Sequence, residues 1–204
     1  MKSILKILTI CIFISSSVVA QEEEDSSLSK SNSPRSEFKH AINICPIAPI
    51  FGFYSINYEY LISPKNGFIA RFDYEDVPKT YTDASIESSG LGFTLNYRRH
   101  FSGEMNSFFL GAYTRYRIYK GSGELDLEKI DLTLQSFSIG LNAGKRWAWD
   151  SGFNIVFSLG YGIDINNSET NPDDGSFDHI VDQFKQEYEF MSPFYGEFSI
   201  GYAF

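Results

Sequence analysis

The sequence predicts an all-β protein, an eight-stranded antiparallel transmembrane β-barrel with both termini on the periplasmic side. Three observations carry this prediction. Eight segments alternate large apolar side chains with small or polar ones, as strands with two different faces do. Short turns alternate with long polar connections along the chain. The sequence also begins with a segment typical of exported proteins.

The first 20 residues have the pattern of a cleavable export signal. Lys2 and Lys6 precede an apolar run, and small side chains follow it as a cleavage site. The apolar run is shorter than the roughly 20 residues that a membrane-spanning helix needs. Residues 21–38 hold few apolar side chains and cannot bury enough surface to offset the entropy of ordering. We therefore expect a signal peptide over 1–20, a disordered periplasmic leader over 21–38 and a barrel over 39–204.

Eight strand segments follow, each close to the ~9–11 residues that a tilted membrane strand requires. In the seventh, apolar residues at odd positions from Phe153 to Ile165 alternate with mostly small or polar residues at even positions. Turn-forming residues bound the segments. The predicted strands are 39–47, 52–62, 67–77, 89–101, 107–119, 134–149, 152–166 and 192–204.

The connections between these segments predict which way up the barrel lies. Three are short and rich in turn residues, at 63–66, 102–106 and 150–151. The alternate ones are long and polar, at 78–88, 120–133 and 167–191, with one short exception at 48–51. Outer-membrane barrels have short periplasmic turns and longer extracellular loops. The long connections are therefore expected outside the cell, and an even strand count places both termini in the periplasm.

Aromatic residues gather beside the short turns. Tyr58, Tyr60, Trp147 and Trp149 are expected at the membrane interface, because rings with one polar edge favour the boundary between lipid and water. The alternative is a soluble, lipocalin-like barrel with its apolar face inside. That barrel would turn charged residues such as Glu59 toward water. Periodicity alone does not separate the two arrangements.

If the polar face is the inner one, acidic and basic side chains share the lumen. An eight-stranded barrel is just wide enough for its own side chains to fill. We expect a structural network in which each ion compensates another for lost hydration. The alternative is a narrow gated ion path that uses the arginines as an anion ladder. The predicted lumen charges are Glu59, Arg71, Asp73, Arg98, Arg115, Arg117, Arg146, Asp164 and Glu197.

Two groups of residues resemble catalytic patterns of other outer-membrane barrels. His100 and Ser102 have the His-x-Ser spacing of lipid A deacylases, but they lie at a predicted periplasmic turn and Gly103 replaces that family's asparagine. A group in the last long connection resembles the paired acids and His-Asp of omptin proteases, which have ten strands. Its members are Asp173, Asp174, Asp178 and His179. We expect no catalytic residues, metal site or cofactor.

The long connections are acidic, for example at Glu124, Asp126, Glu128 and Asp131. We expect a solvated extracellular rim, with an extracellular protein or a divalent cation as a further partner. In the last connection, apolar residues near helical spacing between 180 and 188 leave open whether a short helix forms there. The chain carries 17 basic and 26 acidic residues, and this excess of acid argues against a nucleic-acid partner.

The size, export signal, strand layout and aromatic last strand resemble the small OmpA/OmpX-like barrels of the Gram-negative outer membrane. Segments such as NYEYLISPKNGF and FFLGAYTRYRIY look most similar to an uncharacterised barrel family of Bacteroidota. The resemblance implies a monomer in the cell outer membrane. Its partners would be membrane lipid, lipopolysaccharide and the barrel-assembly machinery. The residues that would form the assembly signal are Phe198, Ile200, Tyr202 and Phe204.

The resemblance specifies fold and compartment better than activity, because such barrels serve adhesion, stability, transport and lipid chemistry alike. We expect a non-enzymatic barrel with acidic extracellular loops and a structural or surface-interaction role. A narrow ion channel through the charged lumen is the first alternative. A lipid-modifying enzyme is the second.

Overall fold

A computed structural model describes residues 38–77, 87–125, 128–170 and 193–204. It does not describe the side chains of residues 51, 77, 87, 122–132 and 166–170. The predicted export signal, and the predicted leader up to residue 37, lie outside the described ranges.

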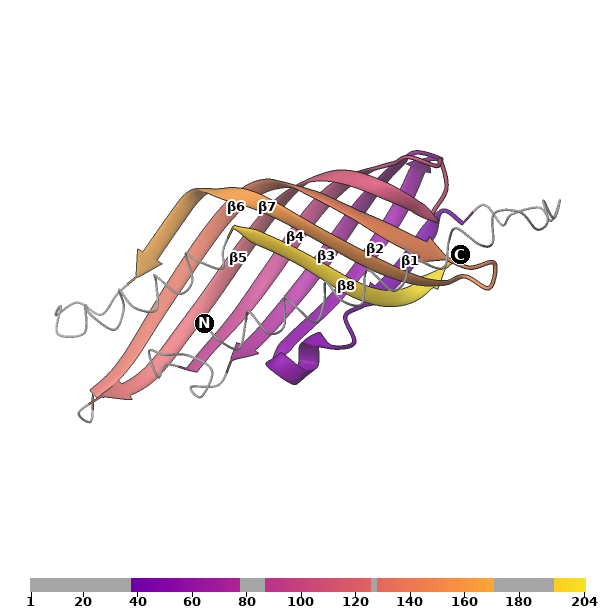
Figure 1. The fold of residues 1–204 in the computed structure, drawn as a ribbon. Helices are drawn as coiled ribbons and strands as arrows, with labels where there is room; N and C mark the ends of the chain where they lie inside the picture. Colours follow the sequence, from indigo (N-terminus) through magenta and orange to yellow (C-terminus); the bar gives the residue numbers. More distant parts are fainter. Residues whose placement is uncertain (1–37, 78–86, 126–127, 171–192) are drawn as a thin grey trace. The chain divides into compact units, whose positions relative to one another are not determined.

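Eight strands form one closed antiparallel barrel, in which each strand pairs with its sequence neighbours and β8 pairs with β1 (Figure 1). The predicted fold class is confirmed. No described helix is long and apolar enough to cross a membrane. The strands are β1 (His40–Ile44), β2 (Phe53–Ser63), β3 (Asn66–Val77), β4 (Glu87–His100), β5 (Ser107–Leu125), β6 (Glu128–Ala148), β7 (Phe153–Thr170) and β8 (Phe194–Ala203), with the short 3-10 helix η2 (Ala48–Phe51) after β1.

The prediction of a polar loop at 120–133 is wrong. β5 runs on to Leu125 and β6 begins at Glu128, and the two strands pair along this whole stretch. The glycines and acidic residues of this stretch are typical of a loop, and main-chain hydrogen bonds hold the hairpin despite them. For the same reason β7 continues to Thr170, beyond the predicted end at 166.

Three tight turns join the strands at the end of the barrel where β8 finishes. In the turn after β6, the N–H of Gly152 donates to the Trp149 carbonyl at 2.8 Å. Gly152 has a φ of 88°, and a Cβ there would lie 2.5 Å from the carbonyl oxygen of Ala203. Both the left-handed backbone and this close approach require glycine. We call this the turn end and the opposite one the loop end.

The apolar phase of the strands faces out and the polar phase faces in. Along β4, Phe93 and Leu95 are 48% and 51% exposed, whereas Thr94 between them is fully buried. The inverted arrangement, with Glu59 turned to the outside, is not found, because Glu59 is fully buried. The lipocalin-like alternative is therefore wrong in its placement of the two faces.

Large rings fill the interior where glycines leave room on the adjacent strand. A Cβ on Gly140 would lie 2.5 Å from the Tyr113 ring, and one on Gly144 would lie 2.7 Å from the Phe109 ring. Tyr113 and Phe109 are themselves buried. These glycines give the rings space to cross the lumen, so the inside of the wall is packed by its own side chains.

An apolar cluster fills the interior at the turn end. Ala41, Leu61 and Ala203 come from strand ends, and Met105 comes from the turn between β4 and β5. Phe38 packs against this cluster. This apolar cluster forms the floor of the interior, and the polar and charged interior residues lie above it.

The seam between β1 and β8 is the shortest pairing in the wall. It joins four residue pairs, from Ala41–Ala203 to Ile44–Ile200, whereas β7 and β8 pair over nine. If this ladder continued, Phe198 would pair with Pro46, but proline has no N–H to donate. The chain turns into η2 instead, and the described residues supply no strand beside β8 from Phe194 to Phe198 on that side.

Candidate functional site

All nine predicted lumen charges stand on the inward phase of their strands. Six are buried to below a tenth exposure, and Arg71, Asp73 and Asp164 are partly buried. Alternation places them there, because a strand turns every second side chain to the same face. The interior holds these charges as two groups, one near the apolar floor and one toward the loop end.

Glu59 on β2 is the centre of the lower group. One carboxylate oxygen lies 2.5 Å from Nη2 of Arg146 and 3.4 Å from Nη1 of Arg98. The other lies 2.8 Å from Nε2 of His100. All four side chains are fully buried. β2, β4 and β6 are thereby tied together across the lumen rather than through the wall.

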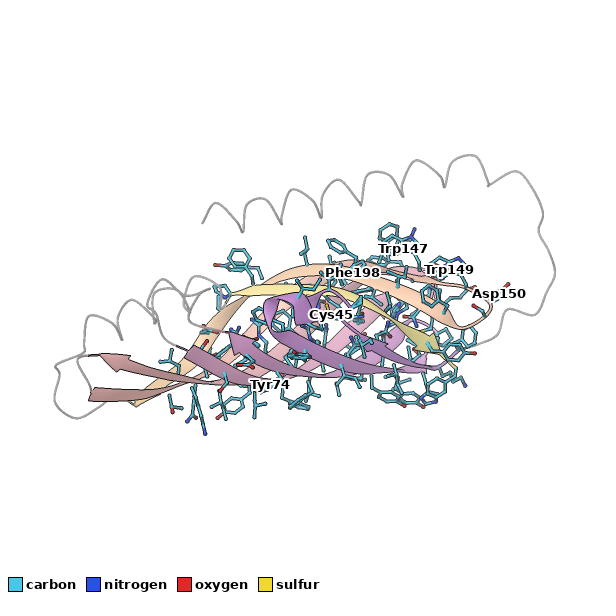
Figure 2. The ribbon with its side chains drawn as sticks, turned by 90° about the horizontal axis from the view of Figure 1, so that it is seen from below. Cys45, Tyr74, Trp147, Trp149, Asp150 and Phe198 are labelled. Atoms are coloured by element: carbon cyan, nitrogen blue, oxygen red, sulfur yellow. The ribbon has the colours of Figure 1, made fainter. Side chains whose placement is uncertain are left out.

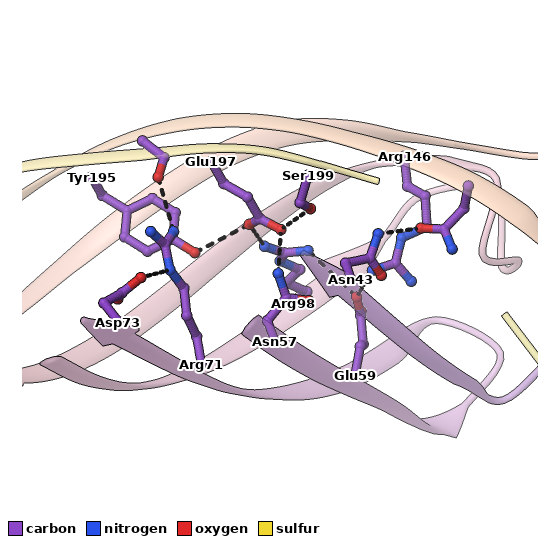
Figure 3. Close-up of polar contacts among 12 residues, drawn as sticks. Asn43, Asn57, Glu59, Arg71, Asp73, Arg98, Arg146, Tyr195, Glu197 and Ser199 are labelled. Carbon is purple, nitrogen blue, oxygen red and sulfur yellow. Dashed lines mark hydrogen bonds and ion pairs between the residues drawn. The ribbon is translucent and has the colours of Figure 1, made fainter. Parts of the chain in front are cut away.

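Glu197 on β8 is the second acceptor of the lower group (Figure 3). Arg98 pairs with its Oε2, and the Tyr195 hydroxyl donates to the same oxygen at 3.2 Å. Its Oε1 accepts from Asn57 Nδ2 at 3.1 Å and from the Ser199 hydroxyl at 3.0 Å. Four donors thus satisfy one buried carboxylate, which offsets much of the cost of removing it from water.

Arg98 lies between the two carboxylates and also packs on an aromatic ring. Its guanidinium carbon is 4.1 Å from the centroid of Phe109. Beside this group the Asn43 amide donates to Asn154 Oδ1 at 2.7 Å, which links β1 to β7. Nearer the floor, Arg146 Nη1 lies 2.7 Å from the sulfur of Met105. The lower group is therefore in contact with the apolar cluster beneath it.

The upper group is less deeply buried. Arg71 Nε pairs with Asp73 Oδ1 at 2.7 Å, and these side chains are 16% and 13% exposed. Arg115 and Arg117 on β5 lie over the rings of Tyr113 and Tyr119, at 5.6 and 5.8 Å from the centroids. Burial of the interior charges therefore decreases toward the loop end.

Two arginines of the upper group bind main-chain carbonyls of β8. Arg71 Nη1 donates to the carbonyl of Gly196 at 2.9 Å, and Arg115 Nη1 donates to the carbonyl of Phe194 at 3.1 Å. Both carbonyls point toward the β1 side. In a strand, every second residue turns its main-chain groups the same way, and Phe204, on the same phase of β8, hydrogen-bonds to His40. The guanidiniums take the place of N–H donors that a longer β1 would have supplied.

The described interior carries acids and bases in equal number. Its carboxylates are Glu59, Asp73, Glu75, Asp164 and Glu197, and its guanidiniums are Arg71, Arg98, Arg115, Arg117 and Arg146. Each group contains both signs. The arrangement neutralises its own charge, as enclosed ions must do to remain charged in a medium of low polarity.

The predicted His-x-Ser pair is not assembled as a catalytic pair. His100 is fully buried and contacts Glu59. Ser102 is exposed in the turn, where its hydroxyl donates to the Asn106 carbonyl at 2.9 Å. The geometry separates the two side chains onto the inside and the outside of the barrel end.

Three other predicted features lie outside the described residues. They are the omptin-like group at 173–179, the apolar residues at 180–188 and most of the acidic loop side chains.

Within the described ranges, no group of three or more His, Cys, Asp or Glu side chains is arranged to hold a metal ion.

The network also contains Asn57, Tyr195, Ser199 and Met105, which were not predicted from the sequence to belong to it. The first three stand on the inward phase of β2 and β8, which a closer reading of the alternation would have found. Met105 lies in a turn, where no periodicity marks an inward residue.

The predicted interface aromatics lie on the outer side near the turn end. Tyr58 and Tyr60 are each 41% exposed. Trp147 lies near the end of β6, and Trp149 begins the turn that holds Asp150 (Figure 2). The Lys145 ammonium lies over the Trp147 ring, at 5.2 Å from its centroid. The four predicted assembly residues all stand on the outward phase of β8 or just after it, from Phe198 to Phe204.

His40 connects the outer aromatics across the seam. Its ring stacks on Tyr60 and Phe204, with centroids 4.9 and 5.5 Å apart, and its Nδ1 lies 2.6 Å from the Tyr58 hydroxyl. The main chain of His40 also exchanges hydrogen bonds with Phe204 at 2.8 and 2.9 Å. Residues of β1, β2 and the end of β8 are thus joined at the point where the barrel closes.

A shallow hollow of about 1050 Å³ follows the outer wall from β2 to β7. Its walls are two neighbouring rows of outward side chains, and they are predominantly apolar. Members of these rows include Tyr60, Phe68, Leu95, Ile139 and Ile163. The hollow has the chemistry of a surface that contacts hydrocarbon rather than water.

Comparison with known proteins gives one family. The model of a family described as "Protein of unknown function (DUF3575)" matches residues 37–202. No curated protein and no solved structure matches the chain.

Proposed function

We propose that this chain, which belongs to the DUF3575 family of proteins of unknown function, is an integral β-barrel of the bacterial outer membrane with a structural or surface-interaction role. The observation that carries the proposal is the distribution of side chains across the wall. Large apolar residues cover the outside, and ion pairs fill the inside. A protein dissolved in water buries the first kind and exposes the second.

The exposed apolar band passes over neighbouring strands. On β7, Leu159, Tyr161 and Ile163 are 56% to 59% exposed, and Leu141 on the adjacent β6 is 69% exposed. Soluble monomers rarely expose a contiguous apolar patch of more than a few hundred Å². A closed barrel also satisfies its main-chain hydrogen bonds internally, which the interior of a bilayer demands. Both features favour lipid as the surrounding solvent.

The filled lumen supports a structural role over transport. The apolar cluster at the turn end and the paired ions above it occupy the interior with the chain's own side chains. The narrow-channel alternative needs guanidiniums available to passing anions. Here Arg71, Arg98 and Arg146 each pair with a carboxylate. A lipid-modifying enzyme would need His100 and Ser102 to act together, and they face different environments.

The orientation that we propose places the tight turns and both described chain ends in the periplasm. The acidic long connections then face the outside, where they are available to an extracellular protein or cation. The export signal predicted from the sequence supports the same compartment. No feature of the described residues favours a nucleic-acid partner, and we propose a monomer.

The first experiment asks whether the purified protein needs a membrane mimic. We expect it to stay folded only in detergent or lipid, and to migrate differently in gels before and after heating, as intact barrels do. Free solubility in water without detergent, with a folded β spectrum, would refute the proposal.

A labelling experiment tests compartment and orientation together. In a Cys45→Ser background, a cysteine at Lys120, exposed near the loop end, should react with a membrane-impermeant maleimide on intact cells. A cysteine at Ser151, exposed in a tight turn, should react only after the cells are opened. The reverse pattern would contradict the orientation, and protection of both sites would contradict the surface location.

A further inference from the structure

A group of polar residues is fixed on the outer face at the turn end, below the exposed aromatics. Asn66 opens β3, and its side-chain oxygen accepts from the Tyr97 hydroxyl at 2.6 Å and from Arg99 Nη1 at 2.8 Å. Its amide nitrogen donates to the Ser63 hydroxyl at 2.5 Å. Asn66 thus fixes the Arg99 guanidinium through one of its N–H groups. The other N–H groups of this guanidinium do not bind Asn66.

Lys65 lies in the adjoining turn. Its carbonyl accepts from the His100 N–H at 2.8 Å, so the main chain of this turn is tied to the end of β4. Its side chain runs along the neighbouring turn, with Cγ and Cε 3.5 and 3.4 Å from the position that a Cβ on Gly103 would occupy. Lys65 and Arg99 are both exposed. A cation from this turn and one from the end of β4 therefore occupy one side of the barrel end.

These two cations have no carboxylate partner among the described residues, in contrast to Arg71, Arg98 and Arg146. Two aromatic rings stand near Arg99 on the outer wall, on the side toward the middle of the strands. Tyr97 and Phe68 lie 5.5 Å apart between centroids, and they are 37% and 52% exposed. Apolar rings on one side and unneutralised cations on the other match the boundary between hydrocarbon and headgroups.

We propose that Arg99 and Lys65 bind the phosphate of a phospholipid in the leaflet on the turn side of the barrel. Arg99 would supply parallel N–H donors to two phosphate oxygens, and Lys65 would supply a point charge. The rings of Phe68 and Tyr97 would contact the glycerol and the first part of the acyl chains. This inference rests on the proposed membrane location and names one lipid class for one place on the wall.

The chemistry favours an anionic headgroup over a zwitterionic one. Phosphatidylglycerol brings a phosphate without a competing ammonium, whereas phosphatidylcholine carries its own cation. Each Lys or Arg near a membrane surface contributes about 1 kcal/mol toward anionic lipid, which corresponds to about a fivefold preference. Two cations without carboxylate partners should therefore produce a measurable preference for phosphatidylglycerol.

The test compares lipids retained by the purified protein in native mass spectrometry. Wild type, an Arg99→Gln/Lys65→Gln double variant and a Lys120→Gln control are exposed to equal amounts of phosphatidylglycerol and phosphatidylcholine in detergent. Lys120 is a matched control because it is an exposed cation on β5 at the other end of the barrel. We expect the preference of wild type for phosphatidylglycerol to fall at least about fivefold in the double variant and to stay unchanged in Lys120→Gln.

Three further outcomes decide the proposal. Equal preference in wild type and the double variant would overturn it, and so would an equal loss in Lys120→Gln. Displacement of the lipid by millimolar inorganic phosphate would identify a free-anion site instead. All proteins are first inserted into phosphatidylcholine vesicles and checked by the heat-dependent gel shift. Failure of wild type to insert would refute the membrane location itself, whereas insertion without a lipid preference would refute only the site.

Discussion

Glu59 shows how single residues hold this interior together. One carboxylate contacts Arg146, Arg98 and His100, which come from β6 and β4, while Glu59 itself stands on β2. None of these side chains has access to water that could take over the role of a lost partner. The free energy of the group therefore depends on the presence of every member.

Replacing Glu59 by Gln should destabilise the protein by ~3–5 kcal/mol, because it leaves buried guanidiniums without their counter-ion. The measurement is urea unfolding of the protein in lipid vesicles, followed by tryptophan fluorescence. Asp150→Asn, in an exposed turn, is the matched removal of one acid and should change the free energy of unfolding by well under ~1 kcal/mol. Equal behaviour of the two variants would contradict a compensated interior network.

Leu159 and Ser158 are neighbours with opposite surroundings, because one is 56% exposed on the outer wall and the other is fully buried inside. Arg at Leu159 should cost ~2–4 kcal/mol of stability in a bilayer, since it moves a charge toward hydrocarbon. The cost should grow when lipids with longer acyl chains are used. Arg at Ser158 should instead reflect overpacking of the lumen and respond little to lipid length. The same dependence at both positions would contradict the outward phase of Leu159.

At the scale of strands, closure depends on few contacts. β1 contributes five residues and meets β8 over four pairs, and His40 adds stacking with Tyr60 and Phe204 at the turn end. Pro46 prevents a longer ladder, and Arg71 and Arg115 compensate two of the β8 carbonyls beyond it. The aromatic stack and the two arginines therefore support the same seam from its opposite ends.

Phe204→Ala should weaken the seam by about 1 kcal/mol, because it removes one aromatic pair while leaving the main-chain bonds to His40 in place. It should also lower the amount of protein in the outer membrane if the last strand is recognised during assembly. Phe153→Ala is the matched control, since Phe153 stacks on Trp149 away from the seam. Stability is measured by urea unfolding and abundance by quantitative immunoblotting of outer membranes. Normal abundance of Phe204→Ala would contradict a role for this residue in assembly.

The sequence predicted the strands well wherever a lipid-like outside and a polar inside gave each strand two different faces. It failed where that contrast ends. Residues 120–133 are rich in glycine and acidic side chains, a composition typical of a loop, and main-chain pairing nevertheless extends β5 and β6 through them. The shortness of β1 was also missed, although Pro46 stood inside the predicted strand.

For the interior, alternation predicted which residues turn inward but not which of them meet. Glu59 and Arg146 are far apart in the sequence and on strands that are not neighbours in the wall. Their contact depends on how far successive strands are staggered when the sheet closes, and a single sequence does not encode that shear in any local pattern. The pairing of Glu197 with Arg98 could not be predicted for the same reason.

At the scale of the whole molecule, the filled interior predicts an electrically silent barrel. Planar bilayers that contain the protein should show no reproducible single-channel steps, while a porin added to the same membrane conducts. The physical reason is that an ion would have to displace both the paired charges around Glu59 and the apolar cluster with Leu61 and Met105. Steps that disappear in Arg98→Ala and Arg115→Ala variants would overturn this expectation and favour the channel.

The first and last strands pair over only a few residues, so the cylinder should separate most readily between them. The free energy of separating two neighbouring strands is lowest where the fewest hydrogen bonds must break at once. The wall should therefore open first between β1 and β8 beside η2, toward the loop end. Such an opening would be sideways, through the wall, rather than along the barrel axis. A barrel whose described interior is filled by its own side chains is thus most yielding at its flank.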